Sequence, residues 1–442
     1  MKRGNSVKAV SGIVFLSAII ITAGFGITYN KDNSLLADGD SKTSSVYTAR
    51  NNDTGNEKEN SLQVAKQQEE KEPAEEKIET ISISAVGDFL IHMGIINSQY
   101  NYVDGKYDFM ENFQYIKDYL EEADLTIGNL ETTFAGSEVP YAGYPTFNCP
   151  DELALAMQNV GVDVVCNMSN HSLDQGEAGF YRTRQVLKNT GFDVIGTRDT
   201  ANDKRYIIKD VKGIKVGIIG YGYMTEDYDG TLGLNCIPIS SEVMPLMNVF
   251  NPNKLDSYLE EMKEQVNLMR QDGADAIVFY MHWGEEYQLE PNESQLRIAQ
   301  FLADQGVDII FGDHPHTIQP FDILTSADGK STTNVIYSLG NFISCQRTES
   351  VDNPYTEDGV IANVEITKNF ATGETKAAPP TYIPTWVKAD SSDVGTKYTV
   401  VPSNKENVDY LQDWQRERLI QSFARTSSIV ESYNQSINVD NN

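Results

Sequence analysis

Short apolar runs that end in polar residues recur along most of this chain. They lie at residues 81–86, 122–127, 161–165, 191–195, 215–219, 273–278, 306–310 and 335–338. Several follow a stretch with helical spacing and a turn that holds glycine, the residue suited to the left-handed position that closes a helix. Short β-branched runs that alternate with helices indicate βαβ units with buried, mostly parallel strands.

Helices are predicted between these runs, where apolar residues recur every three or four positions. The predicted helices span residues 107–122, 151–160, 177–189, 254–271 and 293–304. After Asn341 the pattern changes to alternating strands at 360–366, 382–387 and 398–401, followed by a last helix near 408–432. We therefore expect an α/β fold of central sheets flanked by helices over residues 79–345, completed by the strands and helix of residues 346–442.

The N-terminal region has the pattern of a membrane anchor. Residues 9–28 contain no charged side chain and are long enough to cross the bilayer as a helix. Lys2, Arg3 and Lys8 precede this span, which predicts an N-terminus on the inner side of the membrane and a domain outside the cell. A cleavable signal peptide is the alternative reading of residues 1–30. Residues 31–78 are polar and predict a disordered stalk outside the membrane.

Composition and charge narrow the classes of partner. Apolar residues make up 40% of the chain, which is enough for a buried core. The formal net charge is -29, and the first thirty residues contain no acidic side chain, so the acidity belongs to the rest of the chain. This balance excludes nucleic acid as an expected partner, because phosphate backbones need a basic surface. The 4 cysteines are too few and too scattered for a disulfide framework, although one disulfide stays open.

Chemically active side chains gather just after the predicted strands, where ligands bind in open α/β sheets. All 5 histidines fall there. In chain order the polar residues at these ends are Asp88, His92, Asn129, Glu131, Asn170, His171, Asp174, His282, Glu285, His314, His316 and Asn341. Histidines that only satisfy the core would not be distributed in this way.

Imidazole and carboxylate groups on separate strand ends form a nitrogen and oxygen cage suited to zinc, manganese or iron. The donors exceed what one tetrahedral ion needs, and they suit two divalent ions that share a bridging carboxylate. A triad of Ser169, His171 and Asp174 is a weak alternative, because sequence neighbours rarely adopt that geometry.

Six motifs occur in the same order as in the CapA (PgsA) family of poly-γ-glutamate capsule proteins, which the chain resembles over residues 79–390. They are Val-Gly-Asp88, Gly-Asn-Leu-Glu131, Ser-Asn-His171-Ser-Leu-Asp-Gln-Gly, His282-Trp-Gly, His314-Pro-His316 and Ser-Leu-Gly-Asn341-Phe. The resemblance implies a metallophosphoesterase-like sandwich of central sheets.

The resemblance also implies roles for the site residues. Asp88 and His316 would hold one metal ion, and Asn170, His282 and His314 the other. Glu131 would bridge the two ions, with His92 as a further ligand. His171 would approach the substrate as general acid or as a partner of a phosphate oxygen. From their positions after the strands, Asn129, Asp174, Glu285 and Asn341 are predicted to contact the substrate. The alternatives are that Asp174 orients its loop or His171 and that Glu285 lies in a solvated loop. Two departures stand out: three residues separate Asp88 from His92 where the general motif has one, and Ser172 follows His171 in place of an acid.

By resemblance the chain is a membrane-anchored component of poly-γ-glutamate capsule synthesis or export. Its partners would be that polymer or another cell-envelope polymer, the membrane, and other capsule synthesis subunits. An active site of this kind would make it a dinuclear metal-dependent hydrolase or transferase. The alternatives are an exported phosphoesterase, which should have basic residues in its motif loops, and a non-catalytic scaffold, which should lack ligands. The motif loops contain no basic residue, and no ligand is missing.

Overall fold

The computed structural model describes residues 77–392, 395–404, 409–434 and 437–440. The anchor predicted over residues 1–30 lies outside these ranges, as does nearly all of the stalk predicted over 31–78. Within the described ranges, every helix is too short or too polar to span a membrane.

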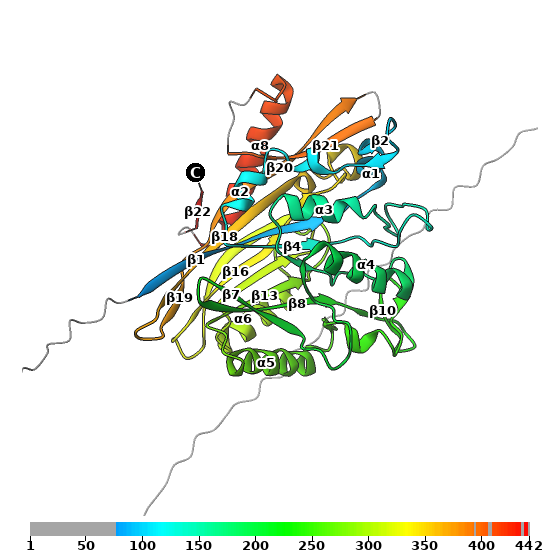
Figure 1. Cartoon of the computed structure of the whole chain (residues 1–442). Helices are drawn as coiled ribbons and strands as arrows, with labels where there is room; N and C mark the ends of the chain where they lie inside the picture. The colour runs from blue at the N-terminus through cyan, green and yellow to red at the C-terminus, as the bar shows by residue number, and fades with distance from the viewer. Residues whose placement is uncertain (1–76, 393–394, 405–408, 435–436, 441–442) are drawn as a thin grey trace, which may run out of the picture. The chain divides into compact units, whose positions relative to one another are not determined.

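A ten-stranded sheet holds the first strand of the described chain at its centre (Figure 1). Its order is β21 (Gly395–Pro402), β20 (Thr381–Ser392), β18 (Asp358–Asn369), β1 (Ile78–Phe89), β4 (Leu125–Leu130), β5 (Val164–Cys166) and β6 (Asp193–Ile195). Three short strands pair beside this path: β17 (Asn341–Ile343), β19 (Thr375–Ala377) and β22 (Asn438–Val439). β1, β4, β5 and β6 run parallel, whereas β18 is antiparallel to β1. The strands that follow residue 345 therefore share a sheet with the strands that precede it.

A seven-stranded sheet forms the second layer. Its order is β12 (Val249–Phe250), β8 (Ile214–Tyr223), β13 (Ala276–His282), β14 (Ile309–Asp313), β16 (Thr332–Leu339) and β15 (Ile318–Thr325), with β7 (Tyr206–Val211) paired to β8. A small sheet of β9 (Thr225–Glu226), β10 (Leu232–Leu234) and β11 (Ile237–Pro238) follows β8. A two-stranded ribbon joins β2 (Tyr100–Asn101) to β3 (Lys106–Tyr107).

Alternating side chains on β13 show how the core is divided. Ala276, Val278 and Tyr280 belong to the apolar core that both sheets share. Ile277 and Phe279 belong to a second core, on the opposite face of the seven-stranded sheet. Because successive side chains of a strand point to opposite faces, a strand that is apolar at every position must be covered on both sides.

Helices supply that cover on the outer face of each sheet. Against the ten-stranded sheet pack α1 (Met93–Ser98), α2 (Lys117–Glu121), α3 (Glu152–Asn159) and α4 (Gly176–Thr190). Against the seven-stranded sheet pack α5 (Leu255–Gln271) and α6 (Glu293–Asp304). The last helix, α8 (Asp413–Val430), contacts β15 and β20. The short elements are η1 (Met110–Phe113), η2 (Met244–Leu246), α7 (Thr348–Val351) and η3 (Pro354–Glu357). The expected α/β arrangement of central sheets flanked by helices is confirmed.

The helix predicted over residues 107–122 is wrong. The segment instead forms β3, the 3-10 turn η1 and the short helix α2. The irregular path stacks the Phe113 ring on Phe342, with 5.8 Å between the ring centroids. The Asn112 side chain donates a hydrogen bond to the carbonyl of Tyr398. These distant contacts outweigh the local preference for one continuous helix.

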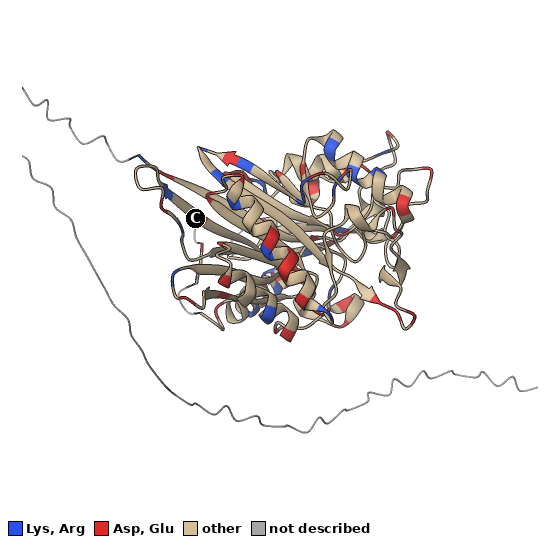
Figure 2. Cartoon of the chain, turned by 90° about the horizontal axis from the view of Figure 1, so that it is seen from below, with Lys and Arg blue, Asp and Glu red and all other residues tan. Residues whose placement is uncertain are grey.

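Charged residues are interspersed over helices and loops in the described part of the chain (Figure 2). Many acids stand beside a base, as in the pairs Arg182–Asp151 and Lys209–Asp193. The excess of acidic residues is therefore spread over the surface.

Candidate metal centre

Three polar residues stand side by side on neighbouring strands, Asp88 and Asn129 near the carboxyl ends of β1 and β4 and Asn341 at the start of β17. Asp88 on β1 is in register with Asn129 on β4 and with Asn341 on β17, and all three are fully buried. The Asn129 amide donates a 2.9 Å hydrogen bond to Asp88 Oδ1. Gly87 lets β1 approach the backbone of Gly340 closely, because a Cβ at residue 87 would lie 1.8 Å from the carbonyl oxygen of Gly340. The ten-stranded sheet thus fixes the Asp88 carboxylate before any ligand binds.

The seven-stranded sheet supplies the histidines. His282 ends β13 in register with Asp313, the last residue of β14, and His282 Nδ1 lies 2.8 Å from Asp313 Oδ1. His314 and His316 follow with φ angles of 94° and 56°, in the left-handed region that side chains rarely adopt. Such backbone strain costs about 1–3 kcal/mol per residue and is concentrated at functional sites. His316 Nδ1 lies 3.2 Å from Asp88 Oδ2, whereas His314 lies with Glu131 and His282.

Glu131, directly after β4, lies between the two sets of residues. Its Oε1 is 3.5 Å from His282 Nε2, and its Oε2 is 3.7 Å from His316 Nδ1. Both oxygens are buried without a hydrogen-bond partner. A buried carboxylate in that condition is strongly destabilised unless a cation accompanies it.

The ligand atoms of these residues form three overlapping groups, each with its atoms within 4.8 Å of one another. The groups are Asp88, Glu131 and His316; Glu131, His282 and His314; and Asp88, His282 and Asp313. Glu131 therefore belongs to two adjacent positions, one on each side of its carboxylate. Nitrogen and oxygen donors of this kind fit zinc, manganese or iron, and the unpartnered atoms of Glu131 fit a bridging ligand.

The electrostatics of the site suit a cation as well. Burial lowers the pKa of His282 to about 3 and that of His314 well below its usual value, so both imidazoles are neutral and able to ligate. Burial, with the charges of Asp88 and Asp313, raises the pKa of Glu131 well above its usual value. Burial acts in the same direction on Asp88, but the nearby His316 outweighs it and holds the pKa of Asp88 below its usual value.

The loop between β5 and α4 adds a ligand and an oriented histidine. Asn170 Oδ1 lies 2.7 Å from His282 Nε2, on the metal side of that ring. His171 Nδ1 lies 2.7 Å from Asp174 Oδ2, and the same oxygen accepts a 2.7 Å hydrogen bond from the backbone N–H of Phe147. The Ser169 hydroxyl accepts from the backbone N–H of His171, so it braces the loop and makes no triad contact with the ring.

A chamber of about 270 Å³ opens over these residues. It is lined by Leu90, His92, Tyr144, Phe147, His171, Glu286, Tyr287, His316, Cys345, Gln346, Ser350 and Val351. Aromatic side chains form much of its wall, and Tyr144 is 76% exposed. None of the described residues that line the chamber is Lys or Arg. Bound metal ions would therefore be the largest positive charges that an anionic group of a substrate meets in the chamber.

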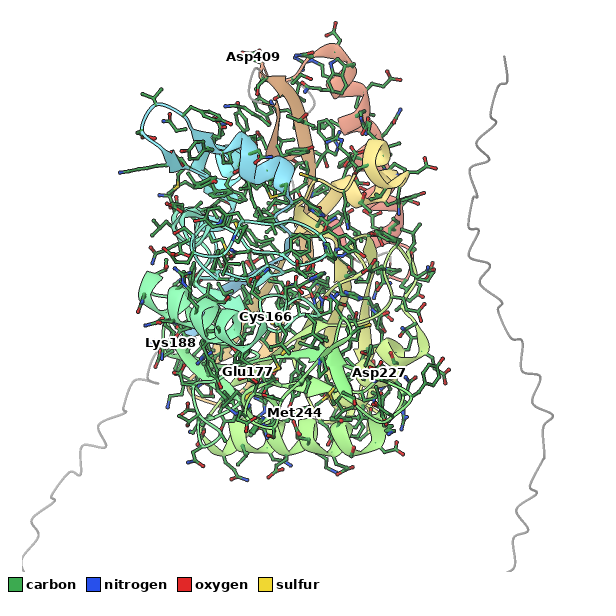
Figure 3. All side chains as sticks on the ribbon, turned by 90° about the vertical axis from the view of Figure 1, so that its right-hand side faces the viewer. Cys166, Glu177, Lys188, Asp227, Met244 and Asp409 are labelled. Carbon is green, nitrogen blue, oxygen red and sulfur yellow. The ribbon has the colours of Figure 1, made fainter. Side chains whose placement is uncertain are left out.

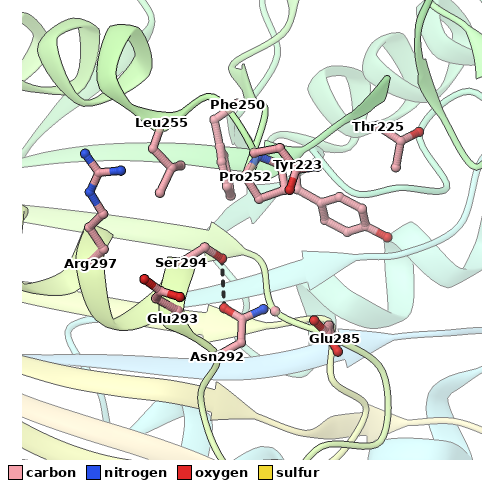
Figure 4. A pocket seen from close by; sticks show the side chains of 12 residues that line it. Tyr223, Thr225, Phe250, Pro252, Leu255, Glu285, Asn292, Glu293, Ser294 and Arg297 are labelled. Carbon is pink, nitrogen blue, oxygen red and sulfur yellow. Dashed lines mark hydrogen bonds between the residues drawn. The ribbon is translucent and has the colours of Figure 1, made fainter. Parts of the chain in front are cut away.

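Three of the residues predicted from the sequence lie away from the expected contacts. His92 stands in the chamber wall with Nδ1 3.2 Å from the carbonyl of Leu90, and it belongs to none of the three groups formed by the described residues. Glu285 is exposed and lines a separate cavity of about 510 Å³ with Tyr223 and Asn292 (Figure 4). Asn341 lies beneath the chamber, with Oδ1 3.1 Å from His316 Nδ1, where it reaches a metal position more directly than a substrate.

Sequence reasoning missed two residues of the site. Asp313 immediately precedes His314 at a strand end, so its position was a signal, but only the strand register pairs it with His282. Asn235 comes from the small sheet after β8. Its amide nitrogen lies 3.4 Å from both ring nitrogens of His171, and no feature of the surrounding sequence indicates this contact.

Comparison with known proteins points in one direction. The family model described as "Bacterial capsule synthesis protein PGA_cap" matches residues 82–346. The capsule biosynthesis protein CapA of Bacillus anthracis is 27% identical over 274 residues, which cover 60% of each chain. The PGA biosynthesis protein CapA of Bacillus subtilis is 25% identical over 271 residues, covering 60% of this chain and 64% of the relative. The match thus spans somewhat less than two thirds of these curated relatives.

Two solved structures show a weaker likeness. A phosphatase from Mycoplasma pneumoniae aligns with a TM-score of 0.37 and 15% identity over 70% of this chain and 94% of its own. The sulfate thiohydrolase SoxB of Thermus thermophilus aligns with a TM-score of 0.36 and 13% identity over 78% of this chain and 61% of its own. Both scores are low, so the sequence matches carry the greater weight.

Proposed function

Because this chain belongs to the PGA_cap family of bacterial capsule synthesis proteins, we propose that it is a membrane-anchored, extracytoplasmic component of poly-γ-glutamate capsule synthesis or export. In this proposal a dinuclear metal centre acts on the polymer, by hydrolysing or transferring its γ-amide bonds. The partners are the polymer, the membrane reached through residues 1–30, and other capsule synthesis subunits.

The observation that supports a metal-dependent reaction most strongly is the Glu131 carboxylate. Its two oxygens face two different histidines, and both are buried without a hydrogen bond. A bridging position between two divalent ions accounts for all of these features. A scaffold would have no reason to retain a buried, unpartnered carboxylate among buried imidazoles.

The metal ions and the side chains of the protein would have separate roles in this reaction. Two divalent ions, when bound, would polarise the scissile carbonyl and activate a water molecule. Hydrolysis adds the oxygen of water to the carbonyl carbon and breaks the carbon–nitrogen bond. The departing nitrogen takes a proton from His171, which Asp174 orients through Nδ1 and which lines the chamber.

Two substitutions in the full-length protein test this proposal. Asp88→Ala should lower the content of bound divalent metal and abolish polymer output. His171→Ala should leave metal content and melting temperature nearly unchanged, yet lower output or hydrolysis by about 10²-fold or more, as for a lost general acid. The measurements are elemental analysis of the purified protein and the amount and chain length of the polymer.

Each other outcome points to a different function. Full output in His171→Ala with none in Asp88→Ala would mean a metal-stabilised binding surface without catalysis. Full output in both variants would mean that the protein acts as a scaffold. Hydrolysis of a phosphate ester, lost in both variants while the polymer is untouched, would mean an exported phosphoesterase.

A further inference from the structure

The segment after β8 reaches across to the loop that holds Asn170 and His171. This segment, residues 225–238, contains β9, β10 and β11 and is called the flap below. Leu234 anchors the flap, since it is 1% exposed and belongs to the shared core that also contains Met168 and Leu173 of the β5–α4 loop. Figure 3 labels Cys166, the last residue of β5, and Asp227 in the flap.

Asn235, the next residue of the flap, contacts both Asn170 and His171. Its Oδ1 accepts a 3.2 Å hydrogen bond from Asn170 Nδ2. Its Nδ2 lies 3.4 Å from Nδ1 and 3.4 Å from Nε2 of His171. A group equally distant from both ring nitrogens, at that length, cannot lie in the ring plane without overlapping a ring carbon. The amide therefore covers one face of the imidazole.

The hydrogen bond between Asn170 and Asn235 determines which way the Asn170 amide points. Asn170 is 1% exposed, and its two side-chain atoms differ only in that one donates and the other accepts. Because Asn235 accepts from the nitrogen, the Asn170 oxygen is directed to the metal side, 2.7 Å from His282 Nε2. Without that acceptor the Asn170 amide is free to rotate and present a nitrogen that cannot ligate a cation.

The backbone of the flap is shaped for this contact. Asn235 and Cys236 have φ angles of 46° and 64°, in the left-handed region. Asparagine adopts this region more readily than other non-glycine residues, which suits it to a tight tip. Asn235 and Cys236 are the two central residues of the tight hairpin turn that joins β10 to the antiparallel β11, a turn in which both positions adopt the left-handed region.

We infer that Asn235 is a positioning residue of the metal centre. Its oxygen holds the Asn170 amide with the oxygen toward the metal, and its nitrogen holds the His171 ring from one face. The inference rests on the proposed function only for the role of His171, since the role of Asn170 concerns metal binding alone.

Asn235→Gly is the most informative substitution, because glycine removes the side chain and tolerates the left-handed backbone. Titration of the chelated full-length protein with Mn²⁺ should show one of two ions bound about 10-fold to 100-fold more weakly, the range found when a group that orients a ligand is lost. The other ion and the melting temperature should change little. Turnover should fall about 10-fold or more.

Asn235→Asp separates the two contacts. Aspartate keeps an oxygen acceptor for Asn170 Nδ2 but has no amide nitrogen for His171. Mn²⁺ affinity should therefore return to within a few fold of the original protein while turnover stays low. Cys236→Gly is the matched control, since it removes the neighbouring side chain of the same exposed turn, keeps the left-handed backbone and should leave affinity and turnover unchanged.

Two results would overturn the inference. One is unchanged Mn²⁺ affinity for both ions in Asn235→Gly. The other is an equal loss of affinity in Cys236→Gly, which would show that any change of side chain at the tip of the flap has this effect. If the original protein binds two ions but acts on no polymer, the proposed function fails while the Mn²⁺ titrations still decide the role of Asn235.

Discussion

Glu131 Oε1 lies 3.5 Å from His282 Nε2, although Glu131 follows β4 and His282 ends β13, which belong to different sheets. The candidate metal centre therefore forms between the two layers of the fold. Neither sheet alone contains a complete set of ligands for either metal position, so the site depends on how the layers pack.

Glu131→Gln should separate the effects of the carboxylate on the metal-free and metal-bound protein. The amide has nearly the same shape and carries no buried charge, so the chelated variant should melt no lower than the chelated original protein. Saturating metal should raise the melting point of the original protein but not that of the variant. A bound ion adds about 2.7 kcal/mol to the free energy of unfolding when its concentration is 100 times Kd. Calorimetry with and without a chelator measures both. An equal rise in the variant would contradict a bridging role.

Asp313→Asn should weaken metal binding, although Asp313 is not one of the ligands assigned to the two proposed metal ions. Asp313 Oδ1 lies 2.8 Å from His282 Nδ1 and so orients the ring with Nε2 toward the metal side. Loss of such a partner lowers metal affinity by about 10-fold to 100-fold. Competition between the protein and a metal-sensitive dye measures the change. Asp322→Asn, a half-buried change on β15, is the control and should have no effect; comparable losses in both variants would count against the assignment.

The thiols should differ sharply in reactivity. Cys149, Cys166, Cys236 and Cys345 are free in the described part of the chain, and only Cys236 is exposed among them. Burial raises the pKa of Cys345 to about 11, so at pH 8 only about one in 10³ of its thiols is ionised. A disulfide reagent should modify one thiol quickly at pH 8, and four after denaturation. Its reaction with Cys345 should quicken as the pH rises toward 11.

Cys236→Ser should remove the fast reaction altogether. A second fast thiol in that variant would mean that the region around Cys345 opens readily in solution.

Membrane topology gives a separate test. Lys2, Arg3 and Lys8 precede the uncharged span at residues 9–28, which predicts an outward-facing domain. Protease added to intact cells or protoplasts should cut within residues 31–78 and release the folded domain. Immunoblotting against the domain, with a cytoplasmic protein as the control for lysis, detects this. Digestion only after the cells are broken would show that the domain faces inward.

The sequence predicts the layers and much of the site for a definite physical reason. Parallel strands align their carboxyl ends, so Asp88 meets Asn129 at one end of the ten-stranded sheet and His282 meets Asp313 at one end of the seven-stranded sheet. The position of Asn170, shortly after β5, follows from the same rule, whereas the direction of its amide depends on Asn235. The spacing of apolar residues in α5 is likewise local information, and the helix lies where the pattern indicates.

The remaining features depend on contacts between distant segments. The turn η1 replaces a helix because Phe113 packs on Phe342, and periodicity within one segment does not report such a partner. Glu285 and Glu286 are neighbours in the chain, yet one lines the outer cavity and the other the chamber. Asn235 stands in a polar, glycine-containing stretch that resembles any surface loop, and only the folded flap brings it to His171.

The central position of β1 also determines when this protein is able to fold. β1 pairs with β4, which follows soon after it, and with β18, whose first residue is Asp358. During synthesis the first of these neighbours emerges early, but the second emerges only after the whole stretch matched by the family model. Until then one edge of β1 is unpaired, and such long-range pairing is slow to form. A nascent chain thus contains all of its histidines before the strand that holds Asp88 has both of its neighbours.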